Sequence, residues 1–433
     1  MEKETIKVAL LGMGTVGSGV YEVIEKLQKD NFKHKVGADV EVKRVLVRTP
    51  AKYADKVMPH TTLTTEWQDI LNDDEISIVI ELMGGIEPAR TYLTEALRAG
   101  KNIVSANKDL IAVHGRELEA LASEMKRDFR YEASALGAIP IVQPLKENLA
   151  ANHFSEIVGI MNGTTNYMLT RMADDGMDYD DALKEAQEKG FAEADPTADV
   201  DGLDAAAKIA ILASIAFNSR VTIDDVPAEG IRNISPTDLV AAKDMGYCIK
   251  LLAHAHRTPE GIDVRVHPTM LPVDHPLSSV NGVFNAIYAV GDFVGETMFF
   301  GEGAGSGAAA SAVMGDVLEV ARHIQQGVAP IVGCTCTDEL PHVPLDDLQT
   351  KYYIRFRVND RPGVLAAMAS VFAQYNVSVH SVMQRGARSD GGVVELVYIT
   401  HTAREASVRD VLREIAALPD ILCAEPSVIR VED

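Results

Sequence analysis

A short apolar segment near the start of the chain runs directly into a glycine-rich turn. The segment Ile6 to Leu11 is typical of a buried parallel strand, and a helix-forming segment covers Ser18 to about Gln28. Between them lie the six turn residues Gly12, Met13, Gly14, Thr15, Val16 and Gly17. Glycines at this spacing allow a tight turn and leave the helix N-terminus open to a pyrophosphate. The pattern predicts an α/β fold with a Rossmann-type domain that binds a dinucleotide through these six residues.

The end of the second predicted strand bears on which dinucleotide is bound. This strand covers Val40 to Val47 and is followed by Arg48. An acidic residue at this point would hold the ribose 2′-hydroxyl of NAD(H), whereas an arginine can pair with the 2′-phosphate of NADP(H). We therefore expect NADP(H) to be accepted, and NAD(H) remains the other candidate. The alternative is that Arg48 lies on a solvated loop.

A cluster of carboxylates precedes an apolar helix that carries one lysine. The cluster comprises Glu193, Asp195, Asp199, Asp201 and Asp204. Lys208 follows Asp204 by four residues, so the two side chains share a face of the helix, and the apolar run from Ala205 to Ala213 predicts that this helix is buried. A buried ammonium group beside a carboxylate is suited to donate a proton, although an ordinary surface ion pair is the alternative. A calcium loop is excluded because Lys208 would occupy the position that requires a glutamate.

Several segments of the sequence resemble homoserine dehydrogenases. They are GMGTVG at 12–17, VSANK at 104–108, NGTTNY at 162–167, the acidic segment at 186–208, RVHP at 265–268 and GEGAGS at 301–306. The resemblance implies an enzyme that interconverts L-aspartate 4-semialdehyde and L-homoserine with a nicotinamide cofactor. It also places the protein in the biosynthesis of threonine, methionine and isoleucine.

The resemblance implies roles for individual residues. The catalytic residues would be Lys208 as proton donor, Asp204 and Lys108, and the substrate with its ammonium group would be bound by Glu193, Asp199 and Asp204. Further cofactor contacts would come from Ser105, Lys108, Gly190, Gly303 and Gly305. The alternatives are a surface lysine that begins a helix at Lys108 and glycines that only form turns.

A loop after the predicted strand Phe129 to Ala133 resembles the monovalent-cation site of the same family. The resemblance implies that backbone carbonyls of Ala135, Gly137 and Ile139, with Glu132 nearby, hold a structural Na⁺ ion. A plain turn between a strand and a helix is the alternative.

The acidic composition limits the possible partners. A net charge of −22 and a pI near 5.0 disfavour nucleic acids and anionic membranes. The sequence has no apolar run long enough for a transmembrane helix, and MEKETIK at its start lacks a signal-peptide core, so we expect a cytoplasmic protein. Four cysteines are too few for a disulfide framework. Cys334 and Cys336 form a C-x-C pair, but no second ligand pair lies near it in the sequence, so we do not expect a metal there.

Changes of pattern along the chain predict three domains and a linker. Residues 1–135 form a Rossmann domain, to which residues 303–326 return, and residues 136–302 form an α+β catalytic and dimerisation domain. Residues 327–349 are a linker without periodicity, and residues 350–433 form the last domain. The resemblance implies a subunit contact through the middle domain, so we expect a homodimer or homotetramer.

The last domain shows the order βαββαβ of a ferredoxin-like fold. Strands are expected at 352–358, 377–384, 393–400 and 421–431, and helices at 363–375 and 403–418. With NDRPGVL at 359–365, this domain resembles an ACT domain, which implies amino-acid effector contacts at Asn359, Asp360 and Gly363. Threonine, an end product of the implied pathway, is the first effector to consider. A domain that only stabilises or dimerises the protein is the alternative.

Two other functions remain open from the sequence. Another ACT-containing NAD(P)-dependent dehydrogenase, such as one acting on 2-hydroxy acids, would be expected to use a catalytic histidine with an arginine. A non-enzymatic amino-acid sensor is disfavoured because both the glycine-rich turn and the acidic segment are intact.

Overall fold

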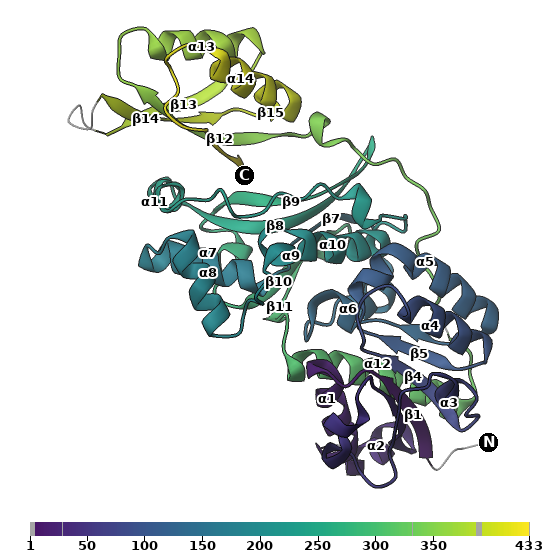
Figure 1. Ribbon diagram of the computed structural model, residues 1–433. Coiled ribbons are helices and arrows are strands. Elements are labelled where there is room, and N and C mark those ends of the chain that lie inside the picture. Colours follow the sequence, from purple (N-terminus) through teal and green to yellow (C-terminus); the bar gives the residue numbers. More distant parts are fainter. Residues whose placement is uncertain (1–4, 28, 331, 387–391, 433) are drawn as a thin grey trace. The chain divides into compact units, whose positions relative to one another are not determined.

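The chain forms two compact units (Figure 1). The computed structural model describes residues 5–27, 29–330, 332–386 and 392–432. The first unit comprises Met1–Ile157, Ala207–Asp225 and Asn285–Leu340, and the second comprises Val158–Ala206, Val226–Phe284 and Pro341–Asp433. Each unit gathers segments from more than one predicted domain, so the predicted domain boundaries stay a prediction.

A six-stranded parallel sheet forms the centre of the first unit. Its strands lie in the order β3 (Thr62–Thr64), β2 (Asp39–Leu46), β1 (Thr5–Leu11), β4 (Ile76–Glu81), β5 (Asn102–Ser105) and β6 (Phe129–Arg130). Every pairing between neighbours is parallel. This is the strand order of a dinucleotide-binding Rossmann sheet, so the predicted fold is confirmed.

Helices pack around this sheet. They are α1 (Thr15–Glu22), α2 (Lys29–Val36), α3 (Gln68–Leu71), α4 (Ala89–Arg98), α5 (Lys108–Met125), α6 (Ala133–Leu136) and α12 (Ser306–Gln326). Figure 1 shows α12, coloured green, beside the purple α1, and Val313 of α12 shares one core with Val20 of α1. Gly19 permits this close approach, because a Cβ atom there would lie 2.5 Å from Ser306 Oγ.

Two predicted elements of this unit need correction. The strand expected to reach Ala133 ends at Arg130, and α6 begins at Ala133 instead. The helix expected up to Gln28 begins earlier, at Thr15, and its last turn is a π-helix over Val23–Leu27. Residue 28 itself lies outside the described residues.

Strands β11 (Gly295–Glu302), β10 (Phe284–Gly291) and β7 (Phe154–Ile160) are neighbours in that order. In the second unit, β8 (Tyr247–Thr258) and β9 (Gly261–Pro272) form a long antiparallel hairpin. Its helices include α7 (Gly163–Asp175), α8 (Tyr179–Glu188), α9 (Thr197–Val200) and α11 (Pro236–Asp244). Among the described residues, no helix is both long and apolar enough to cross a membrane.

The C-terminal part of the second unit has the predicted βαββαβ order. It consists of β12 (Gln349–Asn359), α13 (Val364–Gln374), β13 (Val379–Arg385), β14 (Val393–Thr400), α14 (Glu405–Ala417) and β16 (Ser427–Val431). Two predicted boundaries are wrong: Ala403–Arg404 form a short strand, β15, that pairs with β12, and the last strand begins at Ser427 rather than at Ile421. The sheet order is β16-β12-β14-β13, and β16 also pairs in parallel with β9.

Candidate functional site

The glycine-rich turn after β1 depends on glycine for two different physical reasons. A Cβ atom on Gly17 would lie 2.4 Å from the carbonyl oxygen of Gly12, and one on Gly12 would lie 2.9 Å from that of Leu82. Gly12 also has a φ of +100°. By contrast, the Cβ position of Gly14, the residue before α1, has nothing within 4 Å. The turn is therefore tightly packed on one side and open where the helix N-terminus can meet a phosphate.

A cavity of about 560 Å³ opens at this turn. Gly12, Met13 and Gly14 line it together with Arg48 and Lys52, which follow β2. This volume suits a cofactor-sized ligand. The structure thus brings two cations to the end of β2, where the sequence analysis considered only Arg48. Lys52 follows Arg48 by four residues. The presence of a second basic residue so soon after the strand was the only sequence signal that could have pointed to Lys52.

A buried carboxylate organises the adjoining edge of the sheet. Glu81, at the end of β4, accepts hydrogen bonds from Ser105 Oγ at 2.7 Å and from the Met83 N–H at 2.8 Å. Burial raises the pKa of Glu81. Asn107 caps α5 by accepting from the Leu110 N–H. Sequence reasoning missed Glu81, and the predicted cofactor contact of Ser105 stays a prediction because its hydroxyl already serves this network.

Asn162 joins two of the acidic residues in the second unit. Its Oδ1 accepts hydrogen bonds from the N–H and the hydroxyl of Thr165, each at 2.9 Å, and so caps α7. These donors determine which way the amide points. Its Nδ2 then donates to Asp199 Oδ1 at 2.7 Å and to Asp204 Oδ2 at 2.9 Å. Sequence reasoning assigned no role to Asn162, although it lies in the quoted segment NGTTNY.

The helix after the acidic segment is α10 (Leu203–Ala216), and it is as buried as predicted. Asp204 is 8% exposed and Lys208 is 9% exposed, so neither belongs to an ordinary surface ion pair. The two residues lie one helical turn apart on the same face. Glu193 differs from them because it lies on a loop and is exposed. The backbone carbonyl of Glu193 accepts a hydrogen bond from Gln187 Nε2.

The structure gives local reasons for the other predicted glycines. Gly190 has a φ of +75° after α8, and Gly305 has a φ of +127° just before α12. A Cβ atom on Gly303 would lie 2.0 Å from Asn285 Nδ2, so a larger residue there would require the Asn285 side chain to move. Lys108 is the first residue of α5 and is partly buried. The cofactor contacts of these residues stay predictions.

The predicted cation loop is fastened by Glu132. Its carboxylate accepts three backbone hydrogen bonds, from Ile141 at 2.6 Å, Val142 at 2.8 Å and Gln143 at 2.7 Å. The backbone N–H of Glu132 donates to Asp316 Oδ2. The pKa of Asp316 is raised to about 8, mainly by its burial and secondly by repulsion from the Glu132 carboxylate. Glu132 therefore shapes the loop that carries the carbonyl groups of Ala135, Gly137 and Ile139.

The predicted effector residues lie where β12 turns into α13. Asn359 Nδ2 donates to the backbone carbonyl of Asp420 at 2.9 Å, and the Asp360 N–H donates to the carbonyl of Gly392. Gly363 precedes α13 with a φ of +96°, and its Cβ position has nothing within 4 Å. Asp360 and Gly363 are exposed, whereas the Asn359 side chain holds the turn.

Comparisons with known proteins cover nearly the whole chain. Residues 140–318 match the homoserine dehydrogenase family, residues 12–132 match the homoserine dehydrogenase NAD-binding domain, and residues 352–420 match the ACT domain. A homoserine dehydrogenase of Synechocystis is 44% identical over 436 residues, and one of Bacillus subtilis is 42% identical over 431 residues. Each alignment covers 99% of both chains.

Solved structures agree with these relatives. The crystal structure of a homoserine dehydrogenase from Thiobacillus denitrificans matches with a TM-score of 0.92 and 38% identity, over 99% of this chain and 98% of that one. A hyperthermophilic archaeal homoserine dehydrogenase in complex with NADPH matches with a TM-score of 0.62 and 25% identity, over 73% of this chain and 97% of that one. The chain therefore belongs to the homoserine dehydrogenase family of NAD(P)-dependent oxidoreductases, and it carries a C-terminal ACT domain.

Proposed function

We propose that Lys208 is the proton donor with which this homoserine dehydrogenase reduces L-aspartate 4-semialdehyde to L-homoserine. The observation that carries the proposal is the Asn162 amide, which holds the carboxylates of Asp199 and Asp204 together. Asp204 lies one helical turn before Lys208, and both are buried. A carboxylate pair held in this way can bind the ammonium group of a small zwitterion. The nicotinamide cofactor, when bound, supplies the hydride to the aldehyde carbon.

The residues of this chain then handle charge and protons. Reduction of an aldehyde places negative charge on its oxygen, and the Lys208 ammonium donates a proton to that oxygen. In the reverse direction the neutral amine takes the proton back. Lys108 would assist beside the cofactor, and Glu193 would add a further carboxylate for the substrate ammonium. The low exposure of Asp204 and Lys208 strengthens their electrostatic effect, because little water screens them.

A direct assay tests the reaction. The purified protein is mixed with NADPH and L-aspartate 4-semialdehyde, and loss of the reduced-nicotinamide absorbance is followed. A parallel reaction with 2-oxo acids tests the rival dehydrogenase. We expect NADPH to be oxidised with the semialdehyde and not with the 2-oxo acids. Turnover only with 2-oxo acids would favour the rival enzyme, and no turnover with any substrate would favour an amino-acid sensor.

We also propose that the protein prefers NADP(H), because both Arg48 and Lys52 line the cavity at the glycine-rich turn. Arg48→Asp removes a partner for the 2′-phosphate and adds a repelling charge. A charge-assisted hydrogen bond contributes about 1.5–3 kcal/mol, so the Kd for NADPH should rise by about 10- to 100-fold while that for NADH changes little. Fluorescence titration of both cofactors measures the two constants.

Lys56→Asp is the matched control for this experiment. Lys56 lies in the same loop but is not among the residues that line the cavity. It should change both cofactor affinities little. Equal losses of NADPH and NADH affinity in Arg48→Asp would show that Arg48 does not face the phosphate.

We further propose that threonine inhibits the enzyme through the ACT domain, at Asn359, Asp360 and Gly363. Couplings between sites are typically about 1–3 kcal/mol, so threonine should shift the apparent substrate affinity by roughly 5- to 150-fold. Asp360→Ala should weaken this response, whereas Arg413→Ala, on the exposed face of α14, should keep it. Initial rates and calorimetry with threonine measure the effect. If threonine, methionine, isoleucine and lysine neither bind nor alter the rate, the domain has a structural role only.

A bound cation and an oligomeric state complete the proposal. A monovalent cation, Na⁺ in the simplest case, would bind the carbonyl groups of Ala135, Gly137 and Ile139. The Glu132 carboxylate supports this proposal because it shapes the loop by accepting three backbone N–H groups. A homodimer or homotetramer would cover the exposed apolar side chains on and beside β11, which are Phe293, Val294, Met298 and Phe300.

A further inference from the structure

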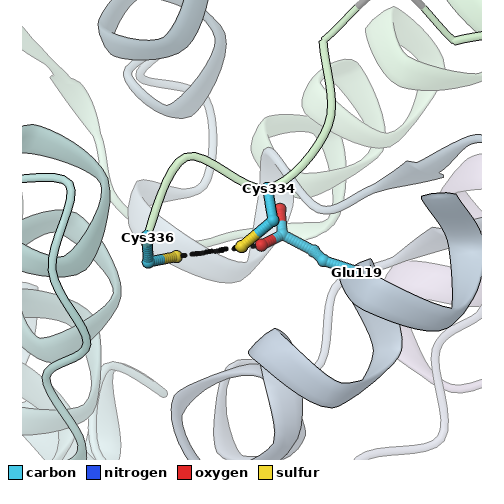
Figure 2. Close-up of side chains that lie close together, drawn as sticks. All are labelled: Glu119, Cys334 and Cys336. Carbon is cyan, nitrogen blue, oxygen red and sulfur yellow. Dashed lines mark hydrogen bonds between the residues drawn. The ribbon is translucent and has the colours of Figure 1, made fainter. Parts of the chain in front are cut away.

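Two cysteines after α12 lie beside a glutamate of α5 in the first unit (Figure 2). Cys334 Sγ is 3.3 Å from Cys336 Sγ, and Cys336 Sγ is 3.9 Å from Glu119 Oε2. Figure 2 shows the sulfur atoms and the carboxylate turned toward one another, from a loop and a helix that are far apart in the sequence. One ligand atom from each residue lies within 4.8 Å of the others. We propose that Cys334, Cys336 and Glu119 bind one Zn²⁺ ion.

The distances fit a tetrahedral zinc site. Zn–S bonds of about 2.3 Å and Zn–O bonds of about 2.0 Å place two sulfur ligands roughly 3.8 Å apart, and a sulfur and an oxygen about 3.5 Å apart. The observed separations differ from these values by less than about 0.6 Å, which small rotations of the side chains can supply. A disulfide would require the two sulfur atoms to approach to about 2.05 Å.

The surroundings of Glu119 orient its carboxylate for such a role. Tyr131 donates its hydroxyl to Glu119 Oε1 at 2.7 Å, and the Lys146 ammonium donates to the same oxygen. The other oxygen, Oε2, is the one that faces Cys336. Hydrogen bonds to the oxygen of a ligating carboxylate that does not face the metal are typical of metal sites, because they fix the orientation of the ligand. Charge also balances, because Zn²⁺ and Lys146 together match two thiolates and one carboxylate, as a buried cluster requires.

The site has room for a fourth ligand. Glu119 is 5% exposed and Cys336 is 7% exposed, while Cys334 is partly exposed. Glu119 and Cys334 line a cavity of about 170 Å³, and Glu119 and Cys336 line another of about 30 Å³. Each can hold a water molecule. Three protein ligands and a water would complete the tetrahedron and fasten the segment after α12 to α5. None of the three ligands is among the residues assigned to the reaction, so the metal would be structural.

Cobalt binding tests this site directly. The full-length protein is reduced, stripped of metal with a chelator, and titrated with Co²⁺, whose thiolate complexes absorb in the near ultraviolet and whose tetrahedral complexes absorb strongly in the visible. We expect one Co²⁺ per chain, both absorptions, and their loss on addition of Zn²⁺. The control is the Cys248→Ser, Cys423→Ser double variant, which removes the other two cysteines and should give the same titration.

Variants of the two cysteines and of Tyr131 test which groups form the site. Cys334→Ser and Cys336→Ser each remove one of the two thiolate ligands. In each variant the near-ultraviolet absorption of the single bound Co²⁺ should be lost. Tyr131→Phe should leave the absorption but weaken Co²⁺ binding by about 10- to 100-fold, as loss of an orienting group does. This variant keeps the proposal testable if Glu119→Gln fails to fold. Unchanged spectra in both cysteine variants would overturn the proposal. So would a reduced protein that binds no Co²⁺, or a Cys334–Cys336 disulfide found by mass spectrometry in a protein that takes up no metal after reduction.

Discussion

Replacement of Lys208 by alanine is expected to lower kcat by about 10²–10⁴-fold, the range that a positioned proton donor contributes. The reason is that the developing alkoxide would have no acid within a buried site, where Lys208 is 9% exposed. Cofactor affinity should change little, because Lys208 is not among the residues that line the cavity at the glycine-rich turn. Steady-state kinetics and fluorescence titration with NADPH measure the two quantities separately.

Two matched variants distinguish proton donation from charge or packing. Lys208→Arg keeps the positive charge but cannot release a proton readily, so its kcat should stay close to that of the alanine variant. Lys184→Ala, on the exposed side of α8, should behave like the wild type. A loss of less than tenfold in Lys208→Ala, or full activity in Lys208→Arg, would remove Lys208 from the donor role.

Replacement of Arg355 by alanine is expected to lower the free energy of unfolding of the second unit by about 3–5 kcal/mol. The side chain of Asp238, in α11, is 0% exposed, and Arg355 of β12 binds both of its oxygens, at 2.7 and 3.0 Å. Tyr353 donates to the same carboxylate at 3.1 Å. Without Arg355, a buried carboxylate would lose the cation that balances it. Urea unfolding followed by circular dichroism measures the shift.

The control for this experiment is an exposed ion pair in the same unit. Arg409 contacts Asp346 at 2.7 Å, but both side chains are about half exposed. Arg409→Ala should therefore change stability by no more than about 1 kcal/mol. If Arg355→Ala has an equally small effect, the carboxylate of Asp238 does not depend on this partner.

The same contacts affect how regulation should be tested. Truncation before β12 is the simplest way to remove the ACT domain. It would, however, also take Arg355 from Asp238, Arg430 from Glu229, and β16 from its pairing with β9. A truncated enzyme that loses its response to threonine could simply be damaged. Point variants at Asp360 separate sensing from stability, because its side chain is exposed.

Local patterns in the sequence were sufficient for several elements. The spacing of Gly12, Gly14 and Gly17 between a strand and a helix predicted the Rossmann turn, because steric limits on backbone conformation act within a few residues. The apolar run after Gly202 predicted the buried helix α10 in the same way. The βαββαβ order of the last domain also follows from local patterns, of which the longest extends over 16 residues, 403–418.

Element ends were less predictable because they depend on tertiary contacts. Ala403–Arg404 resemble the start of a helix, but their pairing with β12 makes them a strand. Residues after Ile421 have strand-forming sequence, but near Ile421 they make only an isolated pairing with β12, in which the Cys423 N–H donates to the Arg357 carbonyl. The continuous ladder with β12 begins at Ser427. Hydrogen-bond partners far along the chain decide such cases.

The sequence by itself therefore determined the cofactor turn, the buried helix with Asp204 and Lys208, and the order of elements in the ACT domain. Only the tertiary structure decided which distant side chains meet: Asn162 with the two aspartates, Lys52 with the glycine-rich turn around one cavity, and Glu119 with the cysteine pair. The C-x-C pair alone did not predict a metal site, because its third ligand lies 217 residues from Cys336. The physical reason is range: backbone sterics and hydrophobic periodicity act between near neighbours, whereas side-chain polar clusters depend on how whole elements pack.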